Sequence, residues 1–292
     1  EIIVNTPNFF LHLHDSLVLI QFLFNGDIDI ATQFKIYIVD YLLTILLGAI
    51  FGSFANVCIY RLPNNKKISK GRSFCPKCKK KINWYDNIPL ISFLILGGKC
   101  RKCKKEISIQ YFLVEVISAF LFTFIYYYFG ISIDTLLLII LGMFLLVIFF
   151  IDLKHYIIPN ELTFPLMGIG FLKSFDPNLN TAIFPNFINS LIGGVLGYLL
   201  IWSIIFFYKQ IRNKEGMGLG DAKLLAVTGF WFGWISVPFV IFSSSIIALI
   251  SVIPSLMTKK RKMTSQIPFG PYIVLATVIY FYFSDYLKGF IF

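Results

Sequence analysis

Long apolar segments recur along most of the chain and constrain its fold more than any other feature. A helix that crosses a bilayer needs roughly 20 mostly apolar residues, and eight segments approach that length. We expect spans at about 38–58, 109–129, 133–151, 161–175, 187–208, 222–235, 237–256 and 271–287. The 292 residues are 57% hydrophobic and 14% charged, against roughly 45–50% and about 25% in soluble domains. The sequence therefore predicts an all-α polytopic membrane protein with about eight transmembrane helices.

Lysine and arginine gather in alternate connections between these segments, which indicates an orientation. Fourteen of them lie between Arg61 and Lys105, whereas the connections near 130–134, 174–186 and 235–237 contain none. Because cytoplasmic loops carry the excess of Lys and Arg, we expect the large basic loop in the cytoplasm and both termini outside. The net charge of +11 then reflects orientation and attraction to anionic lipids, and nucleic-acid binding is not expected.

The order of the segments divides the chain into four expected regions. Residues 1–37 are expected to form an extracytoplasmic or interfacial segment, because their longest apolar run is too short to span. The first transmembrane helix follows at 38–60, and a small cytoplasmic domain at 61–106. Residues 107–292 are expected to form a seven-helix membrane domain.

Four cysteines in the basic loop have the spacing of a zinc site. They form two Cys-x-x-Cys pairs, which consist of Cys75, Cys78, Cys100 and Cys103. Each pair can place two thiolates on one tight turn, and two such turns complete a tetrahedron. Two disulfides are the alternative, but stable disulfides are rare in the cytosol, where the charge pattern places this loop. A four-cysteine site has no open coordination position, so we expect a structural metal that supplies folding energy.

Two carboxylates stand at the ends of predicted spans. Asp152 closes the third span, and Asp221 opens the sixth, directly after Gly218 and Gly220 in a Gly-x-Gly sequence. Charges beside apolar spans are costly, so each aspartate is a candidate functional group. Asp221 could instead cap its helix, and Asp152 could pair with Lys154. What favours a site is that the predicted topology puts both aspartates at the same membrane edge.

The chemistry open to two such carboxylates is acid–base catalysis. The adjoining spans, 161–175 and 222–235, are the shortest, and 15 residues make only about 22 Å of helix against a core of about 30 Å. Water could therefore reach the carboxylates. One ionised carboxylate can take a proton from water while its protonated neighbour polarises a carbonyl. An aspartic peptidase is the leading interpretation, with a proton-coupled transporter and a non-enzymatic receptor as alternatives.

Other polar and aromatic residues near the spans are weaker candidates. Lys223 follows Asp221 by two positions and could tune its carboxylate, bind a lipid phosphate or simply be a solvated charge. Glu115, inside the second span, needs a partner and could contact a substrate. Trp84 and Tyr85 are expected to anchor the basic loop at the membrane interface.

Five motifs, in the same order, resemble those of the type IV prepilin peptidases, which are GxGD-type aspartic membrane proteases. They are FGSFANVCIYRLP (51–63), the tetracysteine segment 75–103 with ISIQYFLVE (107–115), DLKHYIIPNELT (152–163), GMGLGDAKLLA (216–226) and IPFGPY (267–272). The resemblance covers most of the chain after residue 50, and the first 36 residues show no such match.

The resemblance implies a site and an activity. It implies that Asp152 and Asp221 are the catalytic pair and that the four cysteines hold zinc. We expect Gly218, Gly220 and Lys223 to form a supporting catalytic loop. It implies cleavage of prepilins or pseudopilins at the cytoplasmic face of the bacterial inner membrane. It further implies methylation of the new N-terminal amine with S-adenosylmethionine, and the four cysteines favour this bifunctional type.

The resemblance assigns neither the methyl donor's site nor the separate roles of the aspartates. No Gly-rich nucleotide fingerprint is present, so a methyl-donor site around Gly97, Gly98 and Lys99 is only a guess from their composition. A coupled pair of carboxylates titrates as a unit, so the sequence does not separate the acid from the base.

Overall fold

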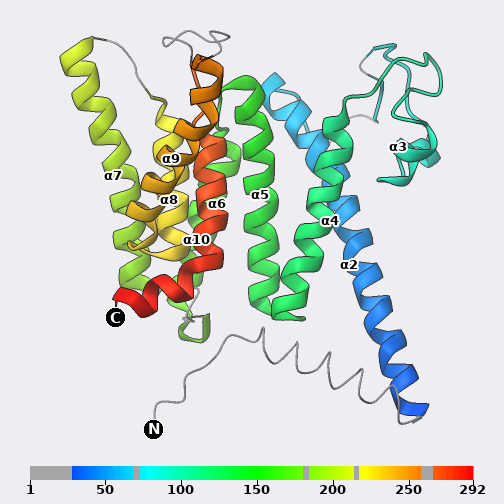
Figure 1. The fold of residues 1–292 in the computed structure, drawn as a ribbon, viewed down its shortest axis with the longest axis horizontal. Coiled ribbons are helices and arrows are strands. Elements are labelled where there is room, and N and C mark those ends of the chain that lie inside the picture. The colour runs from blue at the N-terminus through cyan, green and yellow to red at the C-terminus, as the bar shows by residue number, and fades with distance from the viewer. Residues whose placement is uncertain are drawn as a thin grey trace. The chain divides into compact units, whose positions relative to one another are not determined.

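The protein is built from helices throughout the part of the chain that the structure describes. The computed structural model describes residues 28–68, 73–75, 77–179, 184–213, 217–257 and 266–291 (Figure 1). The long helices are α2 (Ile28–Arg61), α4 (Ile109–Phe129), α5 (Ile133–His155), α6 (Asn160–Leu172), α7 (Phe187–Arg212), α8 (Leu219–Phe232), α9 (Ser236–Met257) and α10 (Gly270–Ile291). Within these ranges the extended pairing is limited to two isolated β-bridges. The predicted all-α class is confirmed.

Each predicted span corresponds to one of these helices. By length and composition, five stretches of the described residues can cross a membrane: Ile38–Asn64, Ile109–Phe129, Ile133–His155, Phe187–Arg212 and Ser236–Ile253. Helices α6 and α8 have only 13 and 14 residues, or about 20 Å of helix each, so both are short as predicted. Helix α2 begins at Ile28, ten residues before the predicted start of the first span, and residues 1–27 lie outside the described part.

Five short elements complete the connections in the described part of the chain. Helix α3 (Ile91–Ile95) lies in the basic loop, preceded by the 3-10 turn η2 (Trp84–Asn87). The other 3-10 turns are η1 (Leu62–Asn64), η3 (Lys173–Phe175) and η4 (Pro177–Leu179). The chain forms two compact units: the first includes α2 up to Asn56 and residues 69–143, and the second includes 57–68 and everything from Phe144 onward.

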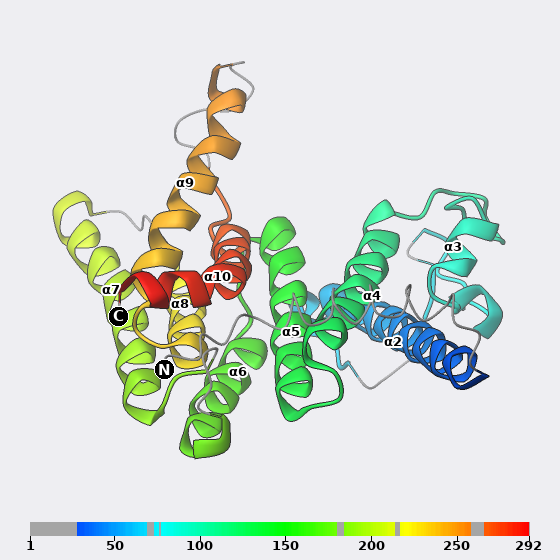
Figure 2. The same cartoon turned by 60° about the horizontal axis from the view of Figure 1, so that its bottom comes forward.

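In the first unit, α2 and α4 approach closely because two glycines on α2 have no side chain. A Cβ at Gly48 would lie 2.6 Å from Ala119 Cα, and one at Gly52 would lie 2.7 Å from Glu115 Cα. Ser118 Oγ donates a hydrogen bond of 2.6 Å to the Gly48 carbonyl. Small residues spaced by four let membrane helices pack backbone to backbone, which places α2 and α4 side by side (Figures 1 and 2).

In the second unit, α8 is the central helix, and it packs most extensively against α7. A Cβ at Gly229 of α8 would overlap the carbonyl of Gly193 on α7. A Cβ at Gly197 would lie 2.7 Å from the Leu225 carbonyl oxygen. Ser190 Oγ adds a hydrogen bond of 2.8 Å to the carbonyl of Phe230. Because α8 is apolar and buried along most of its length, the unit is organised around it.

A buried cation, Lys173 of η3, lies at the C-terminal end of α8. Lys173 Nζ donates to the Trp231 carbonyl at 3.1 Å and lies 4.0 Å from the centroid of the Phe184 ring. A positive charge at a helix C-terminus is favourable, as is a negative charge at its N-terminus. Asp221 lies in the first turn of α8. This short helix therefore has a carboxylate at its N-terminus and the Lys173 cation at its C-terminus, as its dipole favours.

We predict that Gly229→Ala destabilises the protein. The new Cβ would enter the backbone of Gly193, and overpacking of this kind costs about 1–3 kcal/mol. Gly168→Ala is the matched control, because a Cβ at Gly168 has no atom of another element within 4 Å and Ala is the better helix former. Thermal unfolding in detergent measures both. An unchanged midpoint for Gly229→Ala would contradict this packing.

Candidate active site

Asp152 lies near the C-terminal end of α5 and is buried, with 4% of its surface exposed. Its Oδ2 atom accepts a hydrogen bond of 2.9 Å from the backbone N–H of Gly270. Gly270 is the first residue of α10, and the N-terminus of a helix attracts negative charge. The end of one membrane helix is thus joined to the start of another through a single carboxylate.

Asp221 lies in the first turn of α8 and is also buried, with 8% of its surface exposed. Gly218 is the N-cap residue and has an extended backbone, and its carbonyl accepts a bond of 3.2 Å from the Asp221 N–H. Asp221 and Asp152 share neighbours, because Ile158 lies against Gly220, next to Asp221, and against Gly270, whose N–H bonds to Asp152. The two sequence candidates therefore belong to one buried site.

Ile158 packs against the first turns of α8 and α10. A Cβ at Gly220 would lie 3.0 Å from Ile158 Cβ, and one at Gly270 would lie 3.0 Å from Ile158 Cδ1. The same Cβ at Gly270 would lie 2.7 Å from Asp152 Oδ2. Glycine is needed at position 270 because any side chain there would displace the carboxylate. The Ile158 side chain, from the α5–α6 connection, thus contacts the first turns of α8 and α10.

The remaining glycine and lysine of the predicted catalytic loop play different parts. A Cβ at Gly218 would make only ordinary contact, 3.8 Å from Asp221 Oδ2. Lys223 Nζ donates to Asn160 Oδ1 at 2.7 Å and lies 5.2 Å from the centroid of the Phe164 ring. Lys223 therefore ties α8 to the first turns of α6.

Gly270 and Ile158 are the site residues that sequence reasoning missed. In the sequence, Gly270 stands out only as part of the IPFGPY motif before the last span. A usable signal was present, because Pro271 follows Gly270, and proline is favoured in the first turn of a helix. The N-terminus of a helix is a ready site for an anion, and Asp152 was a candidate for that anion.

The arrangement supports acid–base chemistry. Two carboxylates buried in one site can share a single proton, because two like charges held close together are costly. The pair then offers a proton acceptor and a proton donor to a water molecule and a bound carbonyl group.

The four cysteines form a second candidate site, in the first unit. Their Sγ atoms all lie within 4.8 Å of one another, and the residues are Cys75, Cys78, Cys100 and Cys103. The Sγ atoms of Cys75 and Cys103 are 3.9 Å apart. Four thiolates around a zinc ion, with Zn–S distances of about 2.3 Å, lie about 3.8 Å from one another. The cysteines therefore fit a tetrahedral metal ion.

Each cysteine pair is held by the same backbone turn. In the first turn, the Cys75 N–H donates to Lys80 at 3.0 Å, and the Lys79 N–H donates to Cys75 at 2.8 Å. The second turn repeats both bonds at 2.9 Å, between Cys100 and its neighbours Lys105 and Lys104. Lys79 and Lys104 both have φ of 57°. The sequence signal for this repeat is Cys-x-Lys-Cys-Lys-Lys, which occurs at 75–80 and again at 100–105.

The turns also set the acidity of the thiols in the second pair. The backbone N–H of Cys103 lowers the pKa of Cys100 to about 7. At Cys103 the backbone N–H of Lys105 lowers the pKa, but desolvation and the neighbouring thiols outweigh it and raise this pKa to about 11. Because metals bind thiolates, occupation of the cluster would release protons.

The guess for the methyl donor gains no support from the geometry. Gly97 and Gly98 have φ of 56° and 66°, which glycine adopts at no cost. They form the turn between α3 and the second cysteine pair, with the Gly98 carbonyl accepting the Ile107 N–H at 2.7 Å. The turn explains both glycines, and Lys99 is exposed beside them. These three residues show no cradle that fits S-adenosylmethionine.

Glu115 has the partner that a membrane carboxylate requires. Its Oε2 atom accepts a bond of 2.8 Å from the backbone N–H of Leu90, directly before α3. The structure therefore gives Glu115 a structural role, and its contact with a substrate stays a prediction.

Two regions of the chain match known protein families, and together they contain the aspartate pair and the cysteine cluster. Residues 46–129 match the Bacterial Peptidase A24 N-terminal domain, and residues 139–253 match the Type IV leader peptidase family. The first match contains the four cysteines, and the second contains Asp152 and Asp221. No solved structure matches the chain.

Relatives are similar over most of their length. The chain is 34% identical to a protein of Pseudomonas aeruginosa over 84% of this chain and 90% of the relative. It is 36% identical to one of Xanthomonas campestris (84% and 92%) and 34% identical to one of Neisseria gonorrhoeae (83% and 90%). Each relative is named prepilin leader peptidase/N-methyltransferase. The chain therefore belongs to the type IV leader peptidase family.

Proposed function

We propose that this protein cleaves the leader peptide from type IV prepilins or pseudopilins with Asp152 and Asp221, and methylates the new N-terminal amine. The observation that carries the proposal is the pair of buried carboxylates at the starts of α8 and α10, one of them bonded to the Gly270 N–H. The relatives that share both matched regions are named for these two activities.

The cleavage step follows from two carboxylates that share one proton. The ionised member takes a proton from water, whose oxygen attacks the scissile carbonyl carbon. The protonated member donates to the carbonyl oxygen as charge develops there. The C–N bond then breaks as the carboxyl that took the proton from water passes it to the leaving amine. A hydroxyl of the tetrahedral intermediate returns its proton to the other carboxylate, so the pair again holds one proton. We assign these roles to the pair as a unit, with Gly270 orienting the Asp152 carboxylate.

The membrane setting determines how a substrate reaches the pair. The chain is a multi-pass membrane protein of the bacterial inner membrane. We place the active site and the cysteine domain at the cytoplasmic face and both termini outside, because the basic residues lie in alternate connections. The apolar helix of a prepilin enters among the spans, and its leader stays in the cytoplasm. The shortness of α6 and α8 lets water reach the aspartates.

We propose that the cysteine cluster holds zinc. The spacing of the Sγ atoms and the repeated turn support a four-thiolate site without an open position, so the metal stabilises the loop and takes no part in the reaction. The loop region 61–106 is then the metal domain, between the first membrane helix at 38–60 and the peptidase region 107–292. The basic residues around it attract anionic lipids.

S-adenosylmethionine, when bound, supplies the methyl group for the second activity. The alternative functions, a proton-coupled transporter and a non-enzymatic receptor, are not supported, because the matched families and relatives are peptidases.

We predict that Asp152→Asn and Asp221→Asn each abolish cleavage while the fold persists. An amide keeps the shape of the carboxylate but cannot accept the proton, and acid–base groups contribute about 10²–10⁴-fold to rate. The assay uses purified protein in detergent, a prepilin-like peptide and mass spectrometry. Asp176→Asn is the matched control, since Asp176 is exposed. Full activity in either active-site variant would refute the assignment.

We predict that Gly270→Ala slows cleavage by about 10–100-fold, because misplacing a reacting group by about 1 Å has an effect of that size. The new Cβ would lie 2.7 Å from Asp152 Oδ2. It would break the hydrogen bond between this carboxylate and the backbone N–H of residue 270. Gly168→Ala again serves as control. Equal rates for the two variants, measured on folded protein, would show that the Gly270 contact is unimportant.

We predict one zinc ion per chain and its loss in Cys75→Ala. Removing one of four thiolates opens the tetrahedron and weakens the site. Cys58→Ala is the control, because Cys58 lies in α2 outside the cluster. Metal content by atomic absorption and protease resistance of the loop are the measurements. A Cys75→Ala protein with full zinc would mean that the metal sits elsewhere.

A further inference from the structure

An apolar surface interrupts the basic loop of the first unit. Trp84 is 75% exposed, Ile95 74%, Leu94 66% and Ile91 54%. Three of these residues form the outer face of α3, and Trp84 lies in η2 directly before it. Large apolar side chains so exposed in one short segment indicate a surface that is covered by something else.

The opposite face of α3 is packed against the first turns of α4. Phe93 stacks on Phe112 with ring centroids 5.1 Å apart, and the Leu90 N–H bonds to Glu115. The 21 residues of α4 make about 32 Å of helix, which only just spans a core of about 30 Å. Glu115 lies six residues into α4, about 9 Å from its start. Helix α3 therefore lies beside the first turns of α4, not beyond its end (Figure 1).

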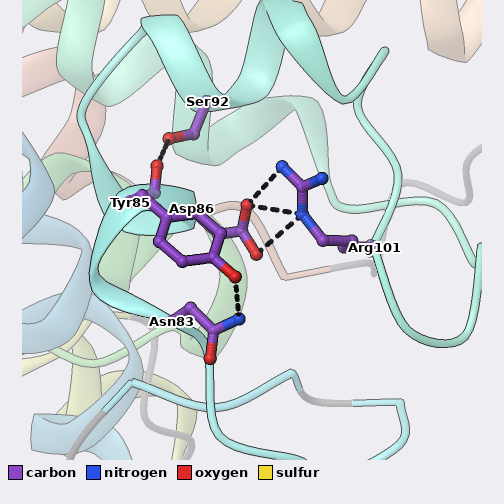
Figure 3. A network of polar contacts seen from close by, with 5 residues as sticks. All are labelled: Asn83, Tyr85, Asp86, Ser92 and Arg101. Carbon is purple, nitrogen blue, oxygen red and sulfur yellow. Dashed lines mark hydrogen bonds and ion pairs between the residues drawn. The ribbon is translucent and has the colours of Figure 1, made fainter.

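The apolar surface is fixed to the second cysteine turn by polar contacts. Asp86 in η2 accepts hydrogen bonds from Arg101 Nε at 2.8 and 3.1 Å and forms an ion pair with the same guanidinium (Figure 3). Ser92 of α3 donates to the Tyr85 carbonyl at 2.9 Å, and Asn83 donates to the Tyr85 hydroxyl at 2.6 Å. The apolar surface and the cysteine turns therefore form one body.

The charge around the apolar surface matches an anionic membrane. Both cysteine turns present exposed basic side chains, which include Lys79, Lys80, Lys81, Lys99, Lys102 and Lys104. Apolar residues combined with a basic rim are the features that hold a segment in the head-group boundary of a bilayer. Lysines near an anionic surface add about 1 kcal/mol each to such binding.

We propose that Trp84 and the outer face of α3 insert into the bilayer beside α4, and that they seat the two cysteine turns on an anionic lipid surface. The occupant of the apolar surface is thus lipid. Glu115 acts as the latch, because its bond to Leu90 holds α3 at that depth. Leu90 has a φ of 62°, an unfavourable conformation for a branched apolar residue, and this bond offsets its cost.

The first test uses the full chain in nanodiscs that contain anionic lipid. The difference in fluorescence between the wild type and Trp84→Phe isolates the emission of Trp84, and this exposed substitution leaves the fold intact. Lipids with a spin label near the head group should quench that emission strongly, and aqueous iodide should quench it weakly. Strong quenching by iodide would overturn the proposal. Quenching by neither agent would also overturn it, because a protein surface would then cover Trp84.

The second test addresses the latch. Glu115→Ala removes the acceptor of the Leu90 N–H, whereas Glu115→Gln keeps an acceptor oxygen in the same place. We expect lipid quenching of Trp84 to fall by at least half in Glu115→Ala and to persist in Glu115→Gln. Zinc content shows whether the cysteine turns remain folded. Equal quenching in both variants, with zinc retained, would refute the role of Glu115.

Discussion

The hydrogen bond from the Gly270 N–H to Asp152 is the contact on which the second unit depends. It joins the end of α5 to the start of α10 across 118 residues of sequence. It is possible only because Gly270 has no side chain, and it brings the start of a helix to a carboxylate that would otherwise be buried without a donor. The same contact holds Asp152 beside the first turn of α8, where Asp221 lies.

The helix ends account for the stability of two carboxylates in an apolar setting. Each aspartate lies at the N-terminus of a helix, Asp221 within α8 and Asp152 against α10, where partial positive charge offsets part of the cost of burial. Close packing at Gly229 lets α8 sit at the centre of its unit. In the proposed topology, the short length of α8 places Asp221 at a membrane edge, where water and substrate can meet. The helix N-termini and the packing of α8 thus contribute both to stability and to the arrangement of the catalytic carboxylates.

The sequence predicts what depends on local pattern. Apolar length defines the helices, and the spacing of the cysteines predicts their cluster, because neighbouring residues determine both. The contacts of Gly270 and the partner of Glu115 could not be predicted, because they join segments whose approach is decided by tertiary packing. Leu90 is an example: no local rule places its N–H against a carboxylate 25 residues away.

The central claim is that the two aspartates act as one catalytic unit. The most direct measurement compares residual cleavage by Asp152→Asn, Asp221→Asn and the double variant in long incubations followed by mass spectrometry. Residues that act as a unit are strongly non-additive. The account predicts that the double variant is no slower than either single variant. Losses that multiply in the double variant would show that the aspartates act independently and would contradict it.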